Sequence, residues 1–115
     1  MYLLNWNETQ TRIEGSLGGR ITFAEAKVFV DDLTALHQKL QTNDLTVRID
    51  RSRVSKLDDG VEDLLSKLTL GFLKTGVNKV TTITKTDAEA THLINLNLQA
   101  TLEGSNEVLA LAQVA

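Results

Sequence analysis

In the middle of the chain the spacing of apolar residues changes from every second residue to a helical repeat. This change constrains the fold more than any other feature. Between Leu45 and Asp50 apolar and polar residues alternate, which is typical of a strand with one face on a core. From Val61 to Phe72 apolar residues recur at helical spacing, which predicts an amphipathic helix that ends near Gly76. A strand that leads into a helix in this way is the start of a βαβ unit.

The segment between this strand and this helix is short and charged, and we interpret residues 51–60 as a loop. In α/β folds the carboxyl ends of strands carry most binding and catalytic sites, so we expect any function to be concentrated at this junction. The charged residues of the loop are Arg51, Arg53, Lys56, Asp58 and Asp59.

The N-terminal part of the chain predicts a hairpin followed by a helix. Residues Met1–Trp6 and Thr9–Gly15 both alternate and are predicted to pair, and a flexible connection follows over residues 15–20. Thr22 and Glu25 form a capping box that predicts a helix start, with Asn43 as the stop. The apolar stripe expected to lie on the sheet comprises Phe23, Ala26, Val30, Leu33, Leu36 and Leu40.

Two apolar residues of this helix, Val28 and Phe29, lie beside the stripe. They either widen the buried face or form an apolar patch that faces a partner.

The C-terminal part of the chain predicts the same alternation of strands and helices. A strand is expected over Val77–Thr84, and the Thr86 cap predicts a helix over Asp87–Asn95. Alternating leucines predict a short strand over Leu98–Leu102. Residues Ser105–Gln113 are predicted as a capped helix, with a strand over residues 108–114 as the open alternative.

This order of elements predicts one α/β domain over residues 1–115. An N-terminal hairpin followed by βαβ units gives a mixed, mostly parallel sheet of about five strands, with about four helices on one face. A 42% apolar composition is sufficient for a core without metals or cross-links.

Composition excludes several kinds of function. Cysteine is absent, which excludes disulfides and thiolate chemistry, and a net charge of −3 argues against nucleic-acid binding. No stretch approaches the roughly 20 apolar residues of a membrane span, and the N-terminus lacks a positive leader, so we expect a cytoplasmic protein without membrane insertion.

No catalytic or cofactor motif stands out. His37 and His92 lack a partner at triad or ligand spacing, and the glycines of residues 15–20 lack the spacing of a P-loop. The acidic residues near the junction match no calcium loop, so we interpret them as a solvated helix start and expect no metal, no cofactor and no enzyme activity. They are Asp50, Asp58, Asp59, Glu62 and Asp63.

The element order and the central strand, loop and helix resemble the STAS domain of sulfate transporters and anti-sigma factor antagonists. In the antagonists the third strand ends in an apolar residue and Asp. An apolar-Asp-Ser-Ser-Gly stretch follows, and the serine before the glycine is phosphorylated. The matching residues here are Ile49, Asp50, Val54, Leu57, Asp58 and Gly60, with Ile13, Gly15 and Leu17 at the segment that closes the second strand.

One departure from the family pattern concerns its switch. Between Asp58 and Gly60 this chain has only Asp59, where the family has two serines. Depending on where the gap is placed, Asp59 stands at the phosphoserine position or at the first serine. Ser52 and Ser55 are candidates for a displaced phosphorylation site, with plain surface serines as the favoured interpretation.

The resemblance implies a non-enzymatic, bacterial partner-switching regulator that binds an anti-sigma factor or a kinase-like protein. The expected contact surface comprises Arg51, Ser52, Arg53, Ser55, Lys56, Asp58, Asp59, Gly60 and Asp63. Two alternatives stay open. One is a small-ligand or lipid-handling module with a cavity lined by Phe23, Phe29, Phe72 and Trp6, and the other is an oligomer subunit, such as a homodimer, that buries Val28 and Phe29.

Overall fold

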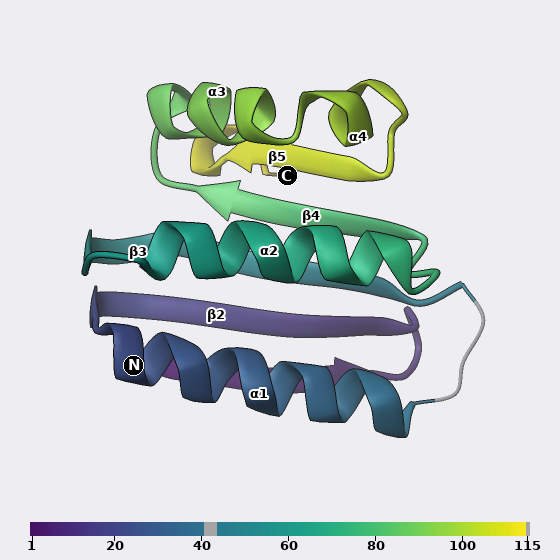
Figure 1. Ribbon diagram of the computed structural model, residues 1–115. Helices are drawn as coiled ribbons and strands as arrows, with labels where there is room; N and C mark the ends of the chain where they lie inside the picture. The colour runs from purple at the N-terminus through teal and green to yellow at the C-terminus, as the bar shows by residue number, and fades with distance from the viewer. Residues whose placement is uncertain (41–43, 115) are drawn as a thin grey trace.

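The computed structural model describes residues 1–40 and 44–114 and has a five-stranded sheet in the order β1-β2-β3-β4-β5. Only β1 and β2 are antiparallel, and the other neighbours are parallel (Figure 1). The strands are β1 (Tyr2–Asn7), β2 (Arg12–Ile21), β3 (Thr46–Leu57), β4 (Lys79–Thr84) and β5 (Asn106–Ala110). The helices are α1 (Phe23–Lys39), α2 (Val61–Lys74), α3 (Asp87–Leu96), α4 (Leu98–Leu102) and a 3₁₀ turn, η1 (Leu111–Gln113). The predicted fold class is confirmed.

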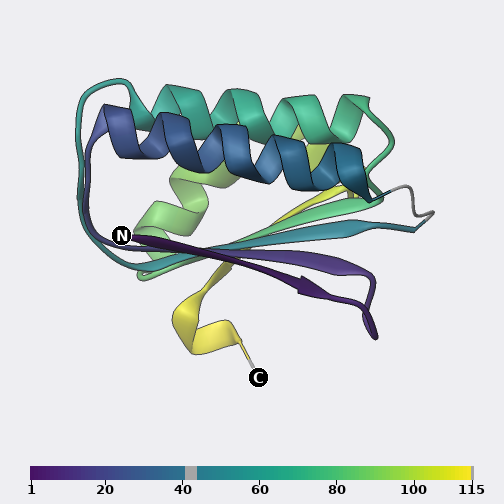
Figure 2. The same ribbon diagram turned by 90° about the horizontal axis from the view of Figure 1, so that it is seen from below.

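The helices α1, α2 and α3 cover one face of the sheet, while η1 lies on the opposite side (Figure 2). This layering follows from the alternation in the strands. Val47 and Ile49 of β3 are buried under the helices, whereas Thr46 and Arg48 lie on the face that the helices leave open.

The main core is centred on Phe29, which is fully buried. Its ring lies against β2, where a Cβ atom on Gly15 would be only 3.0 Å from the ring, so a residue without a side chain is needed there. Tyr2 packs edge-on against the same ring, with the ring centroids 5.3 Å apart. Phe29 therefore widens the buried face of α1, whereas Val28 is 51% exposed and is left without the apolar neighbour that a two-residue patch requires.

Helix ends follow the predicted caps. The hydroxyls of Thr22 and Thr86 accept hydrogen bonds from the amides of Glu25 and Glu89, at 3.2 Å in each case. Helix α1 ends at Lys39, ahead of the predicted stop at Asn43, which lies outside the described residues.

Two predicted loops are in fact strand. Residues 15–20 continue β2, and residues 51–57 continue β3, because the two strands go on pairing with each other beyond their other neighbours. The predictions of a flexible connection and of a charged loop over residues 51–60 were therefore wrong, except for the final turn at residues 58–60.

Two predictions near the C-terminus were also wrong. Residues Leu98–Leu102 form helix α4, in which Leu98 and Leu102 face solvent although they alternate with polar residues. Residues Asn106–Ala110 form β5 rather than a helix, because they pair with the free edge of β4 and bury Val108 and Ala110 against α3. The strand alternative, which covered residues 108–114, is confirmed for residues 108–110, whereas Leu111–Gln113 form η1.

Candidate docking surface at the β3–α2 junction

The carboxyl ends of β2 and β3 form a two-stranded ribbon beyond the rest of the sheet, which we call the β2–β3 extension (residues 18–21 and 53–57). Pairing of β1 with β2 ends at Leu17, and pairing of β3 with β4 ends at Asp50. The extension continues from Gly18 beside Arg53 to Ile21 beside Leu57. Figure 2 shows it curving from the sheet toward the N-termini of α1 and α2.

The turn at residues 58–60 is held to the extension by Asp58. Its amide donates to the carbonyl oxygen of Ile21 at 2.9 Å, and its carboxylate accepts from Nε and Nη2 of Arg20, both at 2.9 Å. The hydrogen bonds from Arg20 are the main cause of a lowered pKa at Asp58, and the charges of Arg20 and Lys56 lower it further. The carboxylate of Asp58, a predicted contact residue, therefore binds Arg20 of the same chain.

The lowered pKa of Asp58 predicts a pH-dependent contribution to stability. A carboxylate with a folded-state pKa below its unfolded value stabilises the fold fully above that unfolded value of about 3.9, and this stabilisation is lost as the pH falls toward the folded-state pKa. We expect Arg20→Gln to lower the urea midpoint at pH 7 and to match the unchanged protein in strong acid. Arg53→Gln, on the same extension, is the control, and the difference between its urea midpoint and that of the unchanged protein should not depend on pH in this way. If Arg20→Gln lowers the urea midpoint equally at all pH values, the ion pair with Asp58 is not the cause.

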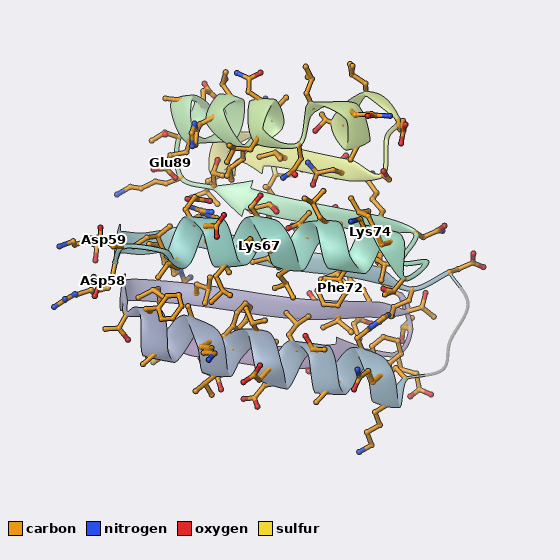
Figure 3. The ribbon with its side chains drawn as sticks, in the orientation of Figure 1. Asp58, Asp59, Lys67, Phe72, Lys74 and Glu89 are labelled. Atoms are coloured by element: carbon orange, nitrogen blue, oxygen red, sulfur yellow. The ribbon has the colours of Figure 1, made fainter. Side chains whose placement is uncertain are left out.

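Gly60 is the N-cap of α2 and has a φ angle of +83°. A Cβ atom there would also lie 3.3 Å from the Phe23 ring, so both the backbone angle and the packing require glycine. This conformation leaves Asp59 exposed at the tip of the turn, and Figure 3 shows Asp58 and Asp59 at the end of the molecule where α1 and α2 begin.

Two of the predicted contact residues, Arg51 and Ser52, are buried. They stand together opposite Leu17, where a β-bulge sets two residues of β3 against one of β2. Arg51 is 8% exposed and binds both carboxylate oxygens of Glu62, at 2.7 and 2.6 Å. Ser52 is 7% exposed, and its amide and hydroxyl donate to Asp50 at 2.9 and 2.6 Å. Their side chains are therefore not accessible to a partner in this conformation.

The remaining predicted residues, apart from Asp58, are exposed, and we call them together the docking surface: Arg53, Ser55, Lys56, Asp59, Gly60 and Asp63. Asp63 lies in the first turn of α2 and pairs with Lys67 at 2.9 Å on the exposed side of the helix. Of the two serine candidates for modification, only Ser55 is exposed. The surface offers charges of both signs.

The acidic residues of the junction do not converge. Asp50 binds Ser52, Asp58 binds Arg20, Glu62 binds Arg51 and Asp63 binds Lys67. Among residues 1–40 and 44–114, no group of three or more His, Cys, Asp or Glu side chains is placed to hold a metal ion.

The two histidines lie apart from each other, and so do the aromatic residues that were expected to line a ligand cavity. His37 of α1 packs on Phe72 of α2, with ring centroids 5.2 Å apart, and His92 is exposed on α3. Phe23 is 46% exposed beside Gly60 while Phe29 is fully buried in the core, so the aromatic residues expected to line a ligand cavity do not surround a common space.

Arg20 was missed as part of this region, and Glu62 was expected at the junction as a solvated acid but not as the partner of Arg51. Arg51 continues the inward alternation of Val47 and Ile49, which is a sequence signal that it needs a buried acidic partner. No comparable signal marks Arg20, which is 38 positions from Asp58.

A hairpin followed by parallel strands, with the helices on one face, is the architecture of the STAS-like fold, and this chain has that fold. Similar solved structures include an uncharacterized protein of the DUF3478 family from Shewanella loihica PV-4, described as having a SpoIIAA-like fold, with a TM-score of 0.66 and 14% identity. This likeness covers 95% of the present chain and 84% of that protein.

The anti-sigma factor antagonist SpoIIAA, in its unphosphorylated form, has a TM-score of 0.63 and 12% identity over 94% of this chain and 86% of SpoIIAA. A protein called Mglu shares 26% identity over 70% of the present chain, with a TM-score of 0.57, and the match spans only 18% of the length of Mglu. No family model and no curated protein sequence matches the chain.

Within the part of the chain that the structure describes, none of the helices is long and apolar enough to cross a membrane.

Proposed function

We propose that this chain is a non-enzymatic, cytoplasmic protein-docking module of the anti-sigma factor antagonist type, which binds an anti-sigma factor or a kinase-like regulator. The observation that carries the proposal is the structural likeness to SpoIIAA over 94% of the chain. It is supported by an exposed turn at the segment where the family motif has its two serines.

The docking surface would act through charge complementarity at the start of α2. Arg53, Lys56, Asp59 and Asp63 are exposed there. Charges at the rim of an interface steer association and select among partners more than they add affinity. The partner would therefore present both acidic and basic side chains to this surface.

Asp59 would carry a permanent negative charge, in place of a negative charge that phosphorylation adds and removes. A phosphate has about two charges and three acceptor oxygens, whereas a carboxylate has one charge and two oxygens. A partner of this chain would thus be selected by a constant and weaker negative charge, and any phosphorylation would occur elsewhere, with Ser55 as the accessible candidate.

Reversal of charge at Asp59 tests the surface. We expect Asp59→Lys to weaken capture of the native partner by about tenfold, since a close like-charge contact replaces an attractive one. Glu103→Lys is the matched control, because it makes the same charge change at an exposed position after α4, and it should retain capture within about twofold.

The measurement is a quantitative pull-down from the native host, followed by titration of the captured protein. Equal effects of the two substitutions would contradict the proposed surface. Phosphatase treatment of the lysate separates a phosphorylation-dependent partner from one that recognises the unmodified chain.

A further inference from the structure

The face of the sheet opposite the helices carries a hollow of about 390 Å³ that the docking surface does not include. One wall is formed by β2, β3, β4 and β5, and the other by the chain at η1, which lies on this side of the sheet in Figure 2. The side chains that define its chemistry are Arg12, Arg48, Lys79, Glu107, Leu109 and Val114. The volume is within the range of small-molecule sites, which starts at about 300 Å³.

Three cationic side chains from three adjacent strands line this hollow, and not all of them are paired. Arg12 contacts Glu14 at 3.3 Å, and Lys79 contacts Glu107 at 3.1 Å. Within the described part of the chain, Arg48 has no hydrogen bond or ion pair, and Nε of Arg12 is buried without a hydrogen-bond partner. Because buried donors are almost always satisfied, Nε of Arg12 indicates an acceptor supplied by a ligand, and the guanidinium of Arg48, which is only half-buried, offers further donors in the same hollow.

The charge balance indicates how much negative charge this ligand carries. Three cations line the hollow together with Glu107, and Glu14 offsets Arg12 from beside it. Asp50, the next acidic residue along β3, lines a second hollow that Arg48 also borders, and it accepts hydrogen bonds from Ser52. The excess is therefore at most about one positive charge, which suits a monoanion better than a phosphate dianion.

The remaining wall is apolar. Leu109 and Val114 line the hollow on the side of β5 and η1. A ligand that satisfies both walls has a single planar anionic group, which a guanidinium fork binds with two hydrogen bonds, and an apolar body.

We propose that this hollow binds a small monocarboxylic acid, with the carboxylate on Arg48 and Nε of Arg12 and the apolar body against Leu109 and Val114. The site is on the open face of the sheet, away from the turn that carries Asp59. It therefore does not depend on the proposed docking function, and the two are tested by different substitutions.

The ligand chemistry is tested by titrating the full chain with octanoate, benzoate, octanamide and inorganic phosphate, and following amide chemical shifts by NMR. We expect saturable shifts in β5 and η1 with at least one carboxylate. Octanamide should bind about tenfold more weakly than octanoate, because it lacks the charge-assisted hydrogen bonds. Absence of binding by both carboxylates, equal binding of octanamide, or tighter binding of phosphate would overturn the proposal.

The position is tested by Arg48→Gln, with Arg53→Gln as a control that removes the same charge from the β2–β3 extension. We expect Arg48→Gln to raise the Kd of the carboxylate at least about tenfold and the control to leave it within about twofold. Arg48→Lys, which keeps the charge but loses the fork, should give an intermediate Kd and serves if the glutamine variant does not fold. An unchanged Kd for a folded Arg48 variant would show that the site is elsewhere.

Discussion

Replacing Phe29 by alanine is expected to lower the free energy of unfolding by about 3–5 kcal/mol. The ring is fully buried, and it fills the space that Gly15 leaves open on β2 and contacts Tyr2 of β1. Its removal therefore creates a cavity between α1 and two strands, and neither glycine nor the sheet backbone can collapse to fill it. Chemical denaturation followed by circular dichroism measures the loss.

The adjacent residue provides the control for this prediction. Val28 is 51% exposed on the same helix, so Val28→Ala should change stability by no more than about 0.5 kcal/mol. Phe29→Leu retains much of the apolar volume and should lose clearly less than Phe29→Ala, which keeps the series measurable if the alanine variant is largely unfolded. Equal losses at positions 28 and 29 would mean that α1 presents a different face to the sheet.

Replacing Glu62 by alanine is the second substitution with a large expected effect. It removes both acceptors of Arg51, whose side chain is 9% exposed, and leaves a buried charge without a partner. Breaking a buried ion pair in this way costs about 3–5 kcal/mol, and because Glu62 itself is 35% exposed we expect a value near 3 kcal/mol.

The next residue of the same helical turn separates this effect from a general loss of charge at the start of α2. Asp63 also pairs with a cation, Lys67, but that pair is exposed, and Asp63→Ala should cost about 0.3–0.5 kcal/mol. Combining Glu62→Ala with Arg51→Met should then recover part of the loss, because the unpaired charge is gone. Additive losses in this cycle would contradict the ion pair as the cause.

Much of the architecture follows from local patterns. The alternation of Val47 and Ile49 with polar residues, the caps at Thr22 and Thr86, and the helical spacing from Val61 to Phe72 all correspond to elements in the structure. Each of these signals arises within a few residues of chain, and each reports burial or hydrogen bonding that the element itself requires.

The segments that were predicted wrongly depend on more than local patterns. Residues 51–57 have the charged composition of a loop, yet they are strand because β2 supplies a partner for their backbone groups. Leu98 and Leu102 alternate like a strand but face solvent in a helix, while residues 106–110 become a strand because the edge of β4 is free. A strand that lies far away in sequence decided the two cases in which a strand formed, residues 51–57 and 106–110.

Some features of the candidate site also follow from local sequence, and others depend on the tertiary structure. Sequence by itself determined the order of elements up to α3, the glycine at the start of α2 and an acidic residue, Asp59, next to it, because these depend on period, backbone angle and residue type. Only the tertiary structure decided which charged residues of the junction reach solvent. Glu62 of the following helix neutralises the buried Arg51, Ser52 is buried beside Asp50, and Arg20 binds Asp58 from 38 positions away in the sequence. The physical reason is that a charge is neutralised by whichever partner the fold brings near. The distance between two charged groups in the folded chain cannot be predicted from the local sequence around either of them.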